Sequence, residues 1–105
     1  MIVRTWHGVA TKENAALYEQ FIKEEIFHEL SQNTIPGFKE IQLLKRESGN
    51  DIEFTTIMWF ENMKAVKQFA GDDFEKAHVP EKARALLSSF DSKSVHSDLT
   101  LKFIP

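Results

Sequence analysis

The chain has 105 residues, 42% hydrophobic and 28% charged, with a formal net charge of −3, which predicts a single domain over residues 1–105 rather than a disordered segment. It has no cysteine, which excludes disulfides and thiolate chemistry, and no dense cluster of Lys and Arg, which argues against a nucleic-acid partner. No apolar run is long enough to be a signal peptide or to span a bilayer, so we expect a cytoplasmic protein without a membrane partner.

The first third of the chain predicts a strand followed by a long helix. Residues Ile2 to Ala10 are rich in β-branched and aromatic side chains, which favours a strand. Thr11 can cap a helix that starts after it. Apolar residues then recur at helical spacing, at Leu17, Tyr18, Phe21, Ile22, Ile26 and Leu30. Asn33 is a candidate for a left-handed residue that ends this helix, and Ile35-Pro36-Gly37 prevents it from continuing.

The middle of the chain predicts a β-hairpin. Phe38 to Arg46 alternates between apolar and polar residues, Ser48-Gly49-Asn50-Asp51 has the composition of a tight turn, and Ile52 to Phe60 is rich in β-formers. The strand from Ile52 to Phe60 is apolar on both faces, with Phe54, Met58 and Phe60 on one face and Ile57 and Trp59 on the other. A sheet covered on one face only would be polar on the other, so we expect the second face to pack against another copy of the chain as a homodimer.

The last part of the chain predicts three helical pieces and a final strand. Asn62 can cap a helix that runs to Ala70, where Gly71 interrupts it. A short helical piece around Phe74 to His78 and a helix over Glu81 to Phe90, with Pro80 in its first turn, should follow. A last strand is predicted from the alternation of Val95, Leu99, Leu101 and Phe103. The order β-α-β-β-α-β is typical of an α+β, ferredoxin-like fold with a four-stranded antiparallel sheet and helices on one face.

Two Glu-x-x-His pairs are the first candidates for chemistry. Glu25-Ile-Phe-His28 and Glu75-Lys-Ala-His78 match part of a carboxylate di-iron site, but that site needs a four-helix bundle, which the predicted strands exclude. The chain has no Gly-x-Ser-x-Gly, phosphate-binding loop or His-Glu-x-x-His motif. We therefore interpret His7 and His96 as structural, hydrogen-bonding residues.

Five short segments suggest a family. They are Arg4-x-Trp6-x-Gly8, Ile35-Pro36-Gly37-Phe38, Phe60-Glu61-Asn62-Met63-Lys64-Ala65, Phe69-Ala70-Gly71-Asp72-Asp73 and Val95-His96-x-x-Leu99. In order and spacing they resemble the antibiotic biosynthesis monooxygenase family of dimeric α+β barrel proteins, and the resemblance covers nearly the whole chain. It implies a ferredoxin-like monomer whose sheet packs on a partner's sheet to form a barrel.

The resemblance implies several activities. Some members oxygenate polycyclic phenols and anthrones with O₂ and no cofactor, others bind and degrade haem, and many have no demonstrated reaction. The haem-degrading branch has an aromatic residue on the second helix, for which it prefers Trp, and a histidine iron ligand after it; Phe69 and His78 fall at these places. That branch also has an Asn on the first strand, where this chain has Trp6 and His7.

Three interpretations of His78 remain open. At a helix end, a charged imidazole would interact favourably with the helix dipole. As a haem ligand, it would need an acceptor for its other ring nitrogen, such as Asp72, Asp73 or Glu75. In a pocket, it could deprotonate a phenolic substrate, because imidazole transfers protons readily near neutral pH.

The function that the resemblance implies is a cofactor-independent monooxygenase acting on O₂ and an electron-rich hydroxyaromatic compound of the quinone or anthrone type. We expect Arg4, Trp6 and His78 to be catalytic and Phe69, Phe74 and Trp59 to bind the substrate, without a metal. The alternatives are a haem-binding, haem-degrading monooxygenase and a non-catalytic dimeric binder. An open cavity lined by Arg4, Trp6 and His78 would favour the enzyme, whereas a pocket filled by the chain's own aromatic side chains would favour the binder.

Overall fold

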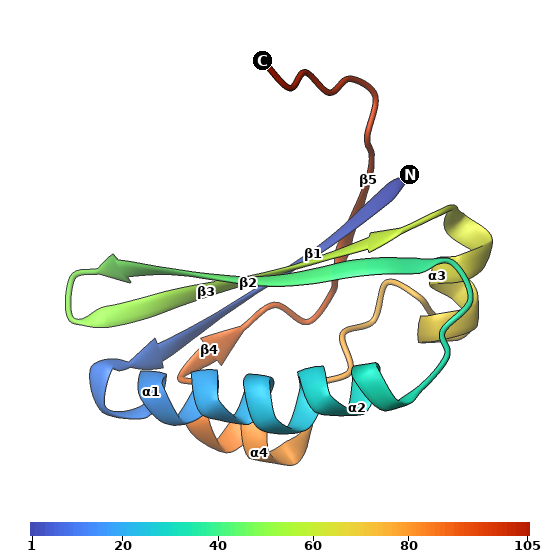
Figure 1. Ribbon diagram of the computed structural model, residues 1–105. Coiled ribbons are helices and arrows are strands. Elements are labelled where there is room, and N and C mark those ends of the chain that lie inside the picture. The colour runs from blue at the N-terminus through green and yellow to red at the C-terminus, as the bar shows by residue number, and fades with distance from the viewer.

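The computed structural model describes residues 1–105 and has a twisted antiparallel sheet with helices on one face (Figure 1). Its long strands β1 (Ile2–Thr11), β2 (Phe38–Ser48) and β3 (Asp51–Phe60) lie in the order β2-β3-β1. The short strands β4 (Ser89–Phe90) and β5 (Val95–Asp98) both pair with the other edge of β1. This is the predicted ferredoxin-like α+β fold, with its fourth strand divided in two.

The predicted first helix is continuous but changes its winding along its length. It consists of α1 (Lys12–Phe21), a π-helical segment η1 (Ile22–Phe27) and α2 (His28–Gln32). The Thr11 side chain accepts a hydrogen bond from the backbone N–H of Asn14, so the predicted cap is confirmed. A π-turn holds one more residue than an α-turn and occurs frequently at functional sites. None of the protein's helices is both long and apolar enough to cross a membrane.

The end of this helix differs from the prediction. Asn33 is extended, with φ −118°, and is not left-handed. The left-handed residue is Gly37, with φ +76°, where an added Cβ would lie 2.5 Å from the Cβ of Ala65. Only glycine combines that backbone conformation with so close an approach of α3.

The other helices are α3 (Met63–Ala70) and α4 (Glu81–Leu86). Asn62 caps α3, as predicted, by accepting a hydrogen bond from the N–H of Ala65. The prediction that α4 continues to Phe90 is wrong. The N–H of Ser88 donates to the carbonyl of Val9 on β1, so pairing with the sheet replaces the helix after Leu86.

The predicted helical piece from Phe74 to His78 is also wrong, because this segment is a turn followed by a bridge at Lys76 and irregular chain. Its backbone bonds to the segment between β4 and β5 instead of to itself. The N–H of Ala77 donates to the carbonyl of Ser92, and the N–H of Ser94 donates to the carbonyl of Glu75. Pro80 adds a local reason, because it disfavours helical conformation in the residue before it.

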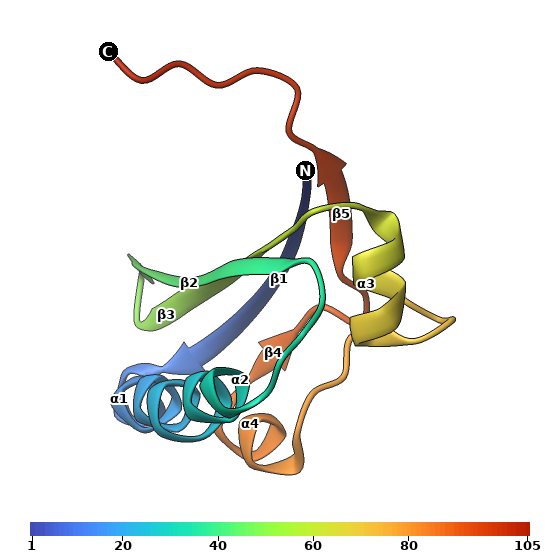
Figure 2. The same ribbon diagram turned by 45° about the vertical axis from the view of Figure 1, so that its right-hand side comes forward.

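The predicted last strand is too long. Strand β5 ends at Asp98, and the N–H of Leu99 makes a final hydrogen bond to the carbonyl of Met1. Residues 99–105 leave the sheet and run away from the body of the molecule (Figure 2), with Leu101 90% and Phe103 86% exposed.

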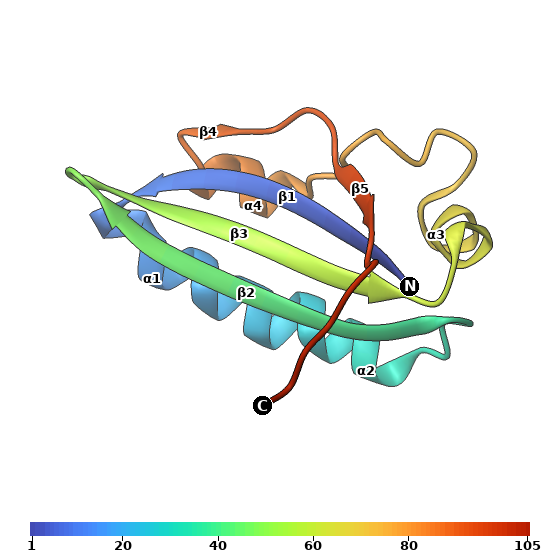
Figure 3. The same cartoon turned by 90° about the horizontal axis from the view of Figure 1, so that it is seen from above.

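The two faces of the sheet have the predicted composition. On β3, Phe54, Met58 and Phe60 point toward the helices and are buried, as the alternation of a strand requires. Ile57 and Trp59 point to the opposite side, which we call the open face. Figure 3 looks onto this face, with α1, α2 and α4 behind the strands.

Candidate functional site

A cavity of about 380 Å³ interrupts the apolar core between the helices and the sheet. One core cluster of nine buried residues includes Tyr18 and Phe21, and a second cluster of five includes Met58. All three of these residues line the cavity, so it lies where the two clusters would otherwise meet. Of the 19 lining residues 13 are hydrophobic, which suits a ligand that is mainly apolar.

Four of the six predicted site residues line this cavity: Arg4, Trp6, Phe69 and His78. The other two do not. Phe74 packs against the ring of His96, with ring centroids 5.3 Å apart, and offers only its backbone carbonyl to Arg4. Trp59 lies on the open face, where its indole Nε1 is buried without a hydrogen-bond partner.

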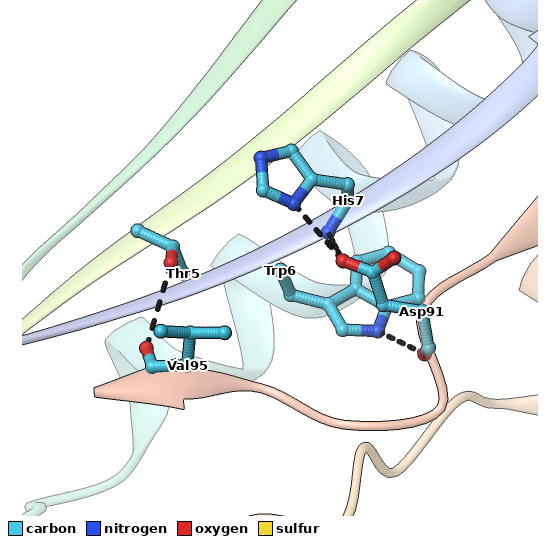
Figure 4. Close-up of polar contacts among 5 residues, drawn as sticks. All are labelled: Thr5, Trp6, His7, Asp91 and Val95. Carbon is cyan, nitrogen blue, oxygen red and sulfur yellow. Dashed lines mark hydrogen bonds and ion pairs between the residues drawn. The ribbon is translucent and has the colours of Figure 1, made fainter.

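The indole of Trp6 is held rigidly as a wall of the cavity. Its Nε1–H donates to the backbone carbonyl of Asp91 at 2.7 Å, and its ring centroid lies 6.0 Å from that of Phe90. The Asp91 carboxylate also accepts from the backbone N–H of His7 and lies 2.9 Å from that residue's Nδ1 (Figure 4). His7 thus has the structural role that we expected, although its side chain is exposed.

Arg4 is the most deeply buried charged residue of the cavity, with 6% of its surface exposed. Its Nη1 donates to the carbonyl of Phe74 at 2.6 Å and lies 3.0 Å from Nε2 of His96. Burial lowers the pKa of Arg4, but a guanidinium remains protonated in proteins. The cavity therefore contains a permanent positive charge.

His78 lies at the exposed edge of the cavity, in the irregular chain before Pro80. Its Nε2 is 3.3 Å from the carbonyl of Ala70 at the end of α3, so this nitrogen is the donor of that contact. The segment from Phe74 to His78 is not helical, so His78 does not end a helix of its own. Its contact with Ala70 nevertheless places the imidazole at the C-terminal end of α3, where its charged form would interact favourably with the helix dipole. The side chain is exposed and lines the cavity, so the haem and proton-transfer interpretations also stay open.

Sequence reasoning missed Tyr18, a buried polar residue of this site. It lines the cavity with 1% of its surface exposed, and burial raises the pKa of its phenol to about 12, while a hydrogen bond with Thr56 lowers that pKa by less. The phenol is therefore neutral. His96 is hydrogen-bonding, as expected, since its Nε2 lies 3.0 Å from Nη1 of Arg4. The signal for Tyr18 was that the chain's single tyrosine stands on the apolar face of the first helix.

Metal-ligating side chains do not gather anywhere in the chain. No group of three or more His, Cys, Asp or Glu residues is placed to hold an ion. Of the two Glu-x-x-His pairs, the first contributes Glu25 to an exposed ion pair with Lys82 at 3.0 Å. The second is divided, since Glu75 lies in the turn and His78 in the irregular chain after it.

No protein-family model matches this chain, and no curated protein matches it in sequence. Solved structures do match. A monooxygenase from the gene ActVA-Orf6 of Streptomyces coelicolor, in complex with nanaomycin D, has a TM-score of 0.68 and 15% identity over 99% of this chain and 91% of that chain. A protein of Bacillus cereus, described as a candidate antibiotic biosynthesis monooxygenase, has a TM-score of 0.67 and 15% identity over 99% and 95% of the two chains.

A haem degrader matches at a similar level. That haem degrader is MhuD from Mycobacterium tuberculosis, whose structure was solved with two haems in its active site. It has a TM-score of 0.60 and 18% identity over 98% of this chain and 99% of that chain. Likeness at such low identity is evidence for a shared fold and not for a shared reaction. Over its whole length, the chain therefore has the ferredoxin-like fold of the antibiotic biosynthesis monooxygenases that its sequence resembles.

Proposed function

We propose that this protein is a monooxygenase that oxidises an electron-rich hydroxyaromatic compound with O₂ and without a metal or organic cofactor. The main support is the open cavity, which Arg4, Trp6 and His78 line together. Its volume of about 380 Å³ falls within the range of about 300–1,000 Å³ that is common for ligand pockets. A similar fold that binds the aromatic ligand nanaomycin D supports the same class of substrate.

The reaction balances without an external reductant. A phenolate or enolate gives one electron to O₂, and the resulting radical pair recombines to form a carbon–oxygen bond. The peroxide takes up a proton, and loss of water from a CH–OOH carbon leaves a carbonyl group. In sum, a CH₂ group and O₂ become C=O and H₂O, with all electrons supplied by the substrate.

The residues of the cavity serve this chemistry by orientation, desolvation and proton transfer. Trp6 and Phe69 are flat walls against which an aromatic ring can pack, and the apolar lining excludes water from the radical pair. His78, at the cavity edge, takes the proton of the substrate. Tyr18, which is neutral, can donate a hydrogen bond to the developing oxyanion.

The direct test is O₂ uptake by the purified protein with a panel of anthrones and hydroquinones, with chelator present. We expect uptake of one O₂ per substrate oxidised and a product with one added oxygen, measured by mass spectrometry with ¹⁸O₂. Binding of these compounds without any O₂ uptake would contradict the proposal and favour a non-catalytic binder of the same fold.

Haem degradation is the second candidate, because His78 lines the cavity and a haem degrader shares the fold. The residues present match the haem-degrading branch only in part, because Phe69 stands where that branch prefers Trp, and Trp6 and His7 stand where its first strand has Asn. The Nε2–H of His78 donates to the carbonyl of Ala70, so Nδ1 would be the nitrogen left to hold iron. In a hemin titration we therefore expect no sharp Soret band at one equivalent. A sharp band that His78→Ala abolishes would make haem degradation the leading function.

The homodimer is part of the same proposal. The open face has partly buried apolar side chains, at Val3, Val9, Ile57 and Trp59. A second copy seated on this face would remove this apolar surface from water.

A further inference from the structure

We propose that Arg4, held by the carbonyl of Phe74 and the ring of His96, forms an anion-binding site in the cavity for an aromatic ligand with one acidic oxygen, a carboxylate or phenolate. The inference deepens the proposed function and rests on it for the identification of this cavity as the ligand site. It adds the charge of the ligand and a positioning role for His96.

The first argument is that Arg4 is buried without a counter-ion. The protein has four ion pairs, and none of them includes Arg4, although only 6% of its surface is exposed. A buried charge is costly unless it is paired. A site that keeps such a charge unpaired is prepared for a charge that arrives with a ligand.

The second argument is that Arg4 has unused donors. A guanidinium has five N–H groups. Arg4 has two acceptors, the carbonyl of Phe74 and Nε2 of His96, and both accept from the same atom, Nη1. Its Nε and Nη2 have no acceptor, yet the one side-chain nitrogen or oxygen that is fully buried without a partner is Nε1 of Trp59. Nε and Nη2 are therefore accessible, on a residue that lines the cavity. Together they match the two oxygens of a carboxylate.

The third argument is the state of His96. Arginine can only donate, so Nε2 of His96 must accept, and its proton is on Nδ1. Burial and, after it, the charge of Arg4 lower the pKa of His96, while Glu75 raises it to a lesser extent. The ring is thus a neutral acceptor. It orients the guanidinium and leaves its charge in place. A carboxylate at the same position would neutralise that charge.

The rest of the lining is consistent with a single anionic contact. Glu29 is the one carboxylate among the lining residues, and it is exposed on α2. Most other lining residues are apolar, so a polyanion would leave charges unpaired in the cavity. A flat apolar ligand with one acidic group satisfies both the walls and Arg4.

The test compares two probes of nearly the same shape, anthracene-9-carboxylate and anthracene-9-carboxamide, by their fluorescence anisotropy. We expect the wild type to bind the carboxylate about tenfold or more tightly, because hydrogen bonds to charged groups are stronger. Arg4→Gln should abolish this preference, and Arg4→Lys should keep part of it, since the charge remains but the fork of donors is lost.

Position 96 provides the decisive matched pair. His96→Gln keeps a neutral acceptor for Arg4 and should keep the preference for the carboxylate. His96→Glu introduces a carboxylate beside Arg4 and should abolish the preference, although Arg4 is unchanged. Melting temperatures check that both variants are folded. The loss of preference in His96→Glu but not in His96→Gln would distinguish charge compensation from structural damage.

Three outcomes would overturn the inference: equal binding of the two probes by the wild type, a preference that survives in Arg4→Gln, or no binding of the carboxylate up to its solubility limit. The measurement needs no turnover, so it is separable from the proposed function. A protein that oxygenates anthrones but shows no preference would retain the monooxygenase proposal and lose the anion site. A protein that prefers the carboxylate but oxygenates none of the anthrones would retain the anion site and lose the monooxygenase proposal.

Discussion

His96 and His78 show how the surroundings of a side chain decide what a histidine can do. His96 is half-buried against Arg4 and Phe74, so its ring is a neutral acceptor. His78 is exposed at the cavity edge and has only the carbonyl of Ala70 as a partner. The first is thus placed to position a charge, and the second to exchange a proton with a ligand.

Acid should destabilise the protein through His96. Its pKa in the folded state is lower than the ordinary value of 6.5, so the unfolded chain binds a proton more readily. The free energy of unfolding should therefore fall as the pH decreases through about 6.5, and continue to fall until the pH passes the folded pKa. His96→Gln should remove this component. The check is the melting temperature of both proteins between about pH 8 and pH 5; identical pH profiles would contradict the prediction.

His78→Ala should reduce turnover and leave the fold intact. The loss of a general base costs about a hundredfold or more in rate. The side chain is exposed and makes one long hydrogen bond, at 3.3 Å, so the melting temperature should barely change. O₂ uptake and thermal unfolding of the same preparation measure the two effects. A variant with full activity would remove His78 from the mechanism, and one that melts far below the wild type would give it a structural role instead.

At the scale of elements, the cavity exists because two segments do not continue as helices. The chain from residue 72 to 80 bonds to the segment between β4 and β5, and α4 gives way to pairing with β1 after Leu86. As a result, α1 and α4 cover one end of the sheet and α3 covers the other. The irregular segment that carries His78 passes beside the cavity between them.

The connection from the first helix to β2 depends on Gly37. Gly37→Ala should destabilise the protein by more than about 1 kcal/mol, because the left-handed backbone and the 2.5 Å approach to the Ala65 Cβ both oppose a side chain. Gly49→Ala is the matched control, since Gly49 has φ +62° but no atom within 4 Å of the added Cβ. Urea unfolding of both variants isolates the packing contribution. Equal losses would mean that the contact with α3 relaxes at no cost.

At the scale of the whole molecule, the open face and the C-terminal tail are the parts that a monomer leaves without packing partners. Leu101, Phe103 and Ile104 are at least 75% exposed on a segment that points away from the domain (Figure 2). Monomeric proteins rarely expose so much apolar surface in one place. A second copy of the chain packed on the open face would cover the apolar side chains there.

The protein should therefore be a homodimer, and Ile57→Asp should dissociate it. An interface of this kind buries about 2,000 Å² or more, and a charge placed at its centre cannot be desolvated cheaply. Leu17→Asp is the matched control, because Leu17 is 53% exposed on α1, away from the open face. Light scattering at low micromolar concentration, with circular dichroism to verify folding, measures the outcome. A monomeric wild type would contradict the prediction.

The sequence by itself determined the elements whose cause is local. Caps at Thr11 and Asn62, the two-sided apolar alternation of β3 and the glycine turns all depend on neighbouring residues, and they predicted the ferredoxin-like fold. Four of the six predicted site residues were also found at one cavity, because alternation along β1 puts Arg4 and Trp6 on the same face.

Only the tertiary structure decided the features that depend on distant partners. The segment from Phe74 to His78 has the residues of a short helix, but its hydrogen bonds go to Ser92 and Ser94, which no local pattern reveals. Trp59 lies on the face away from the cavity, because the direction of the strand's alternation is set by which face the helices cover. The contact between Arg4 and His96 joins residues 92 positions apart, and only the pairing of β1 with β5 brings them together.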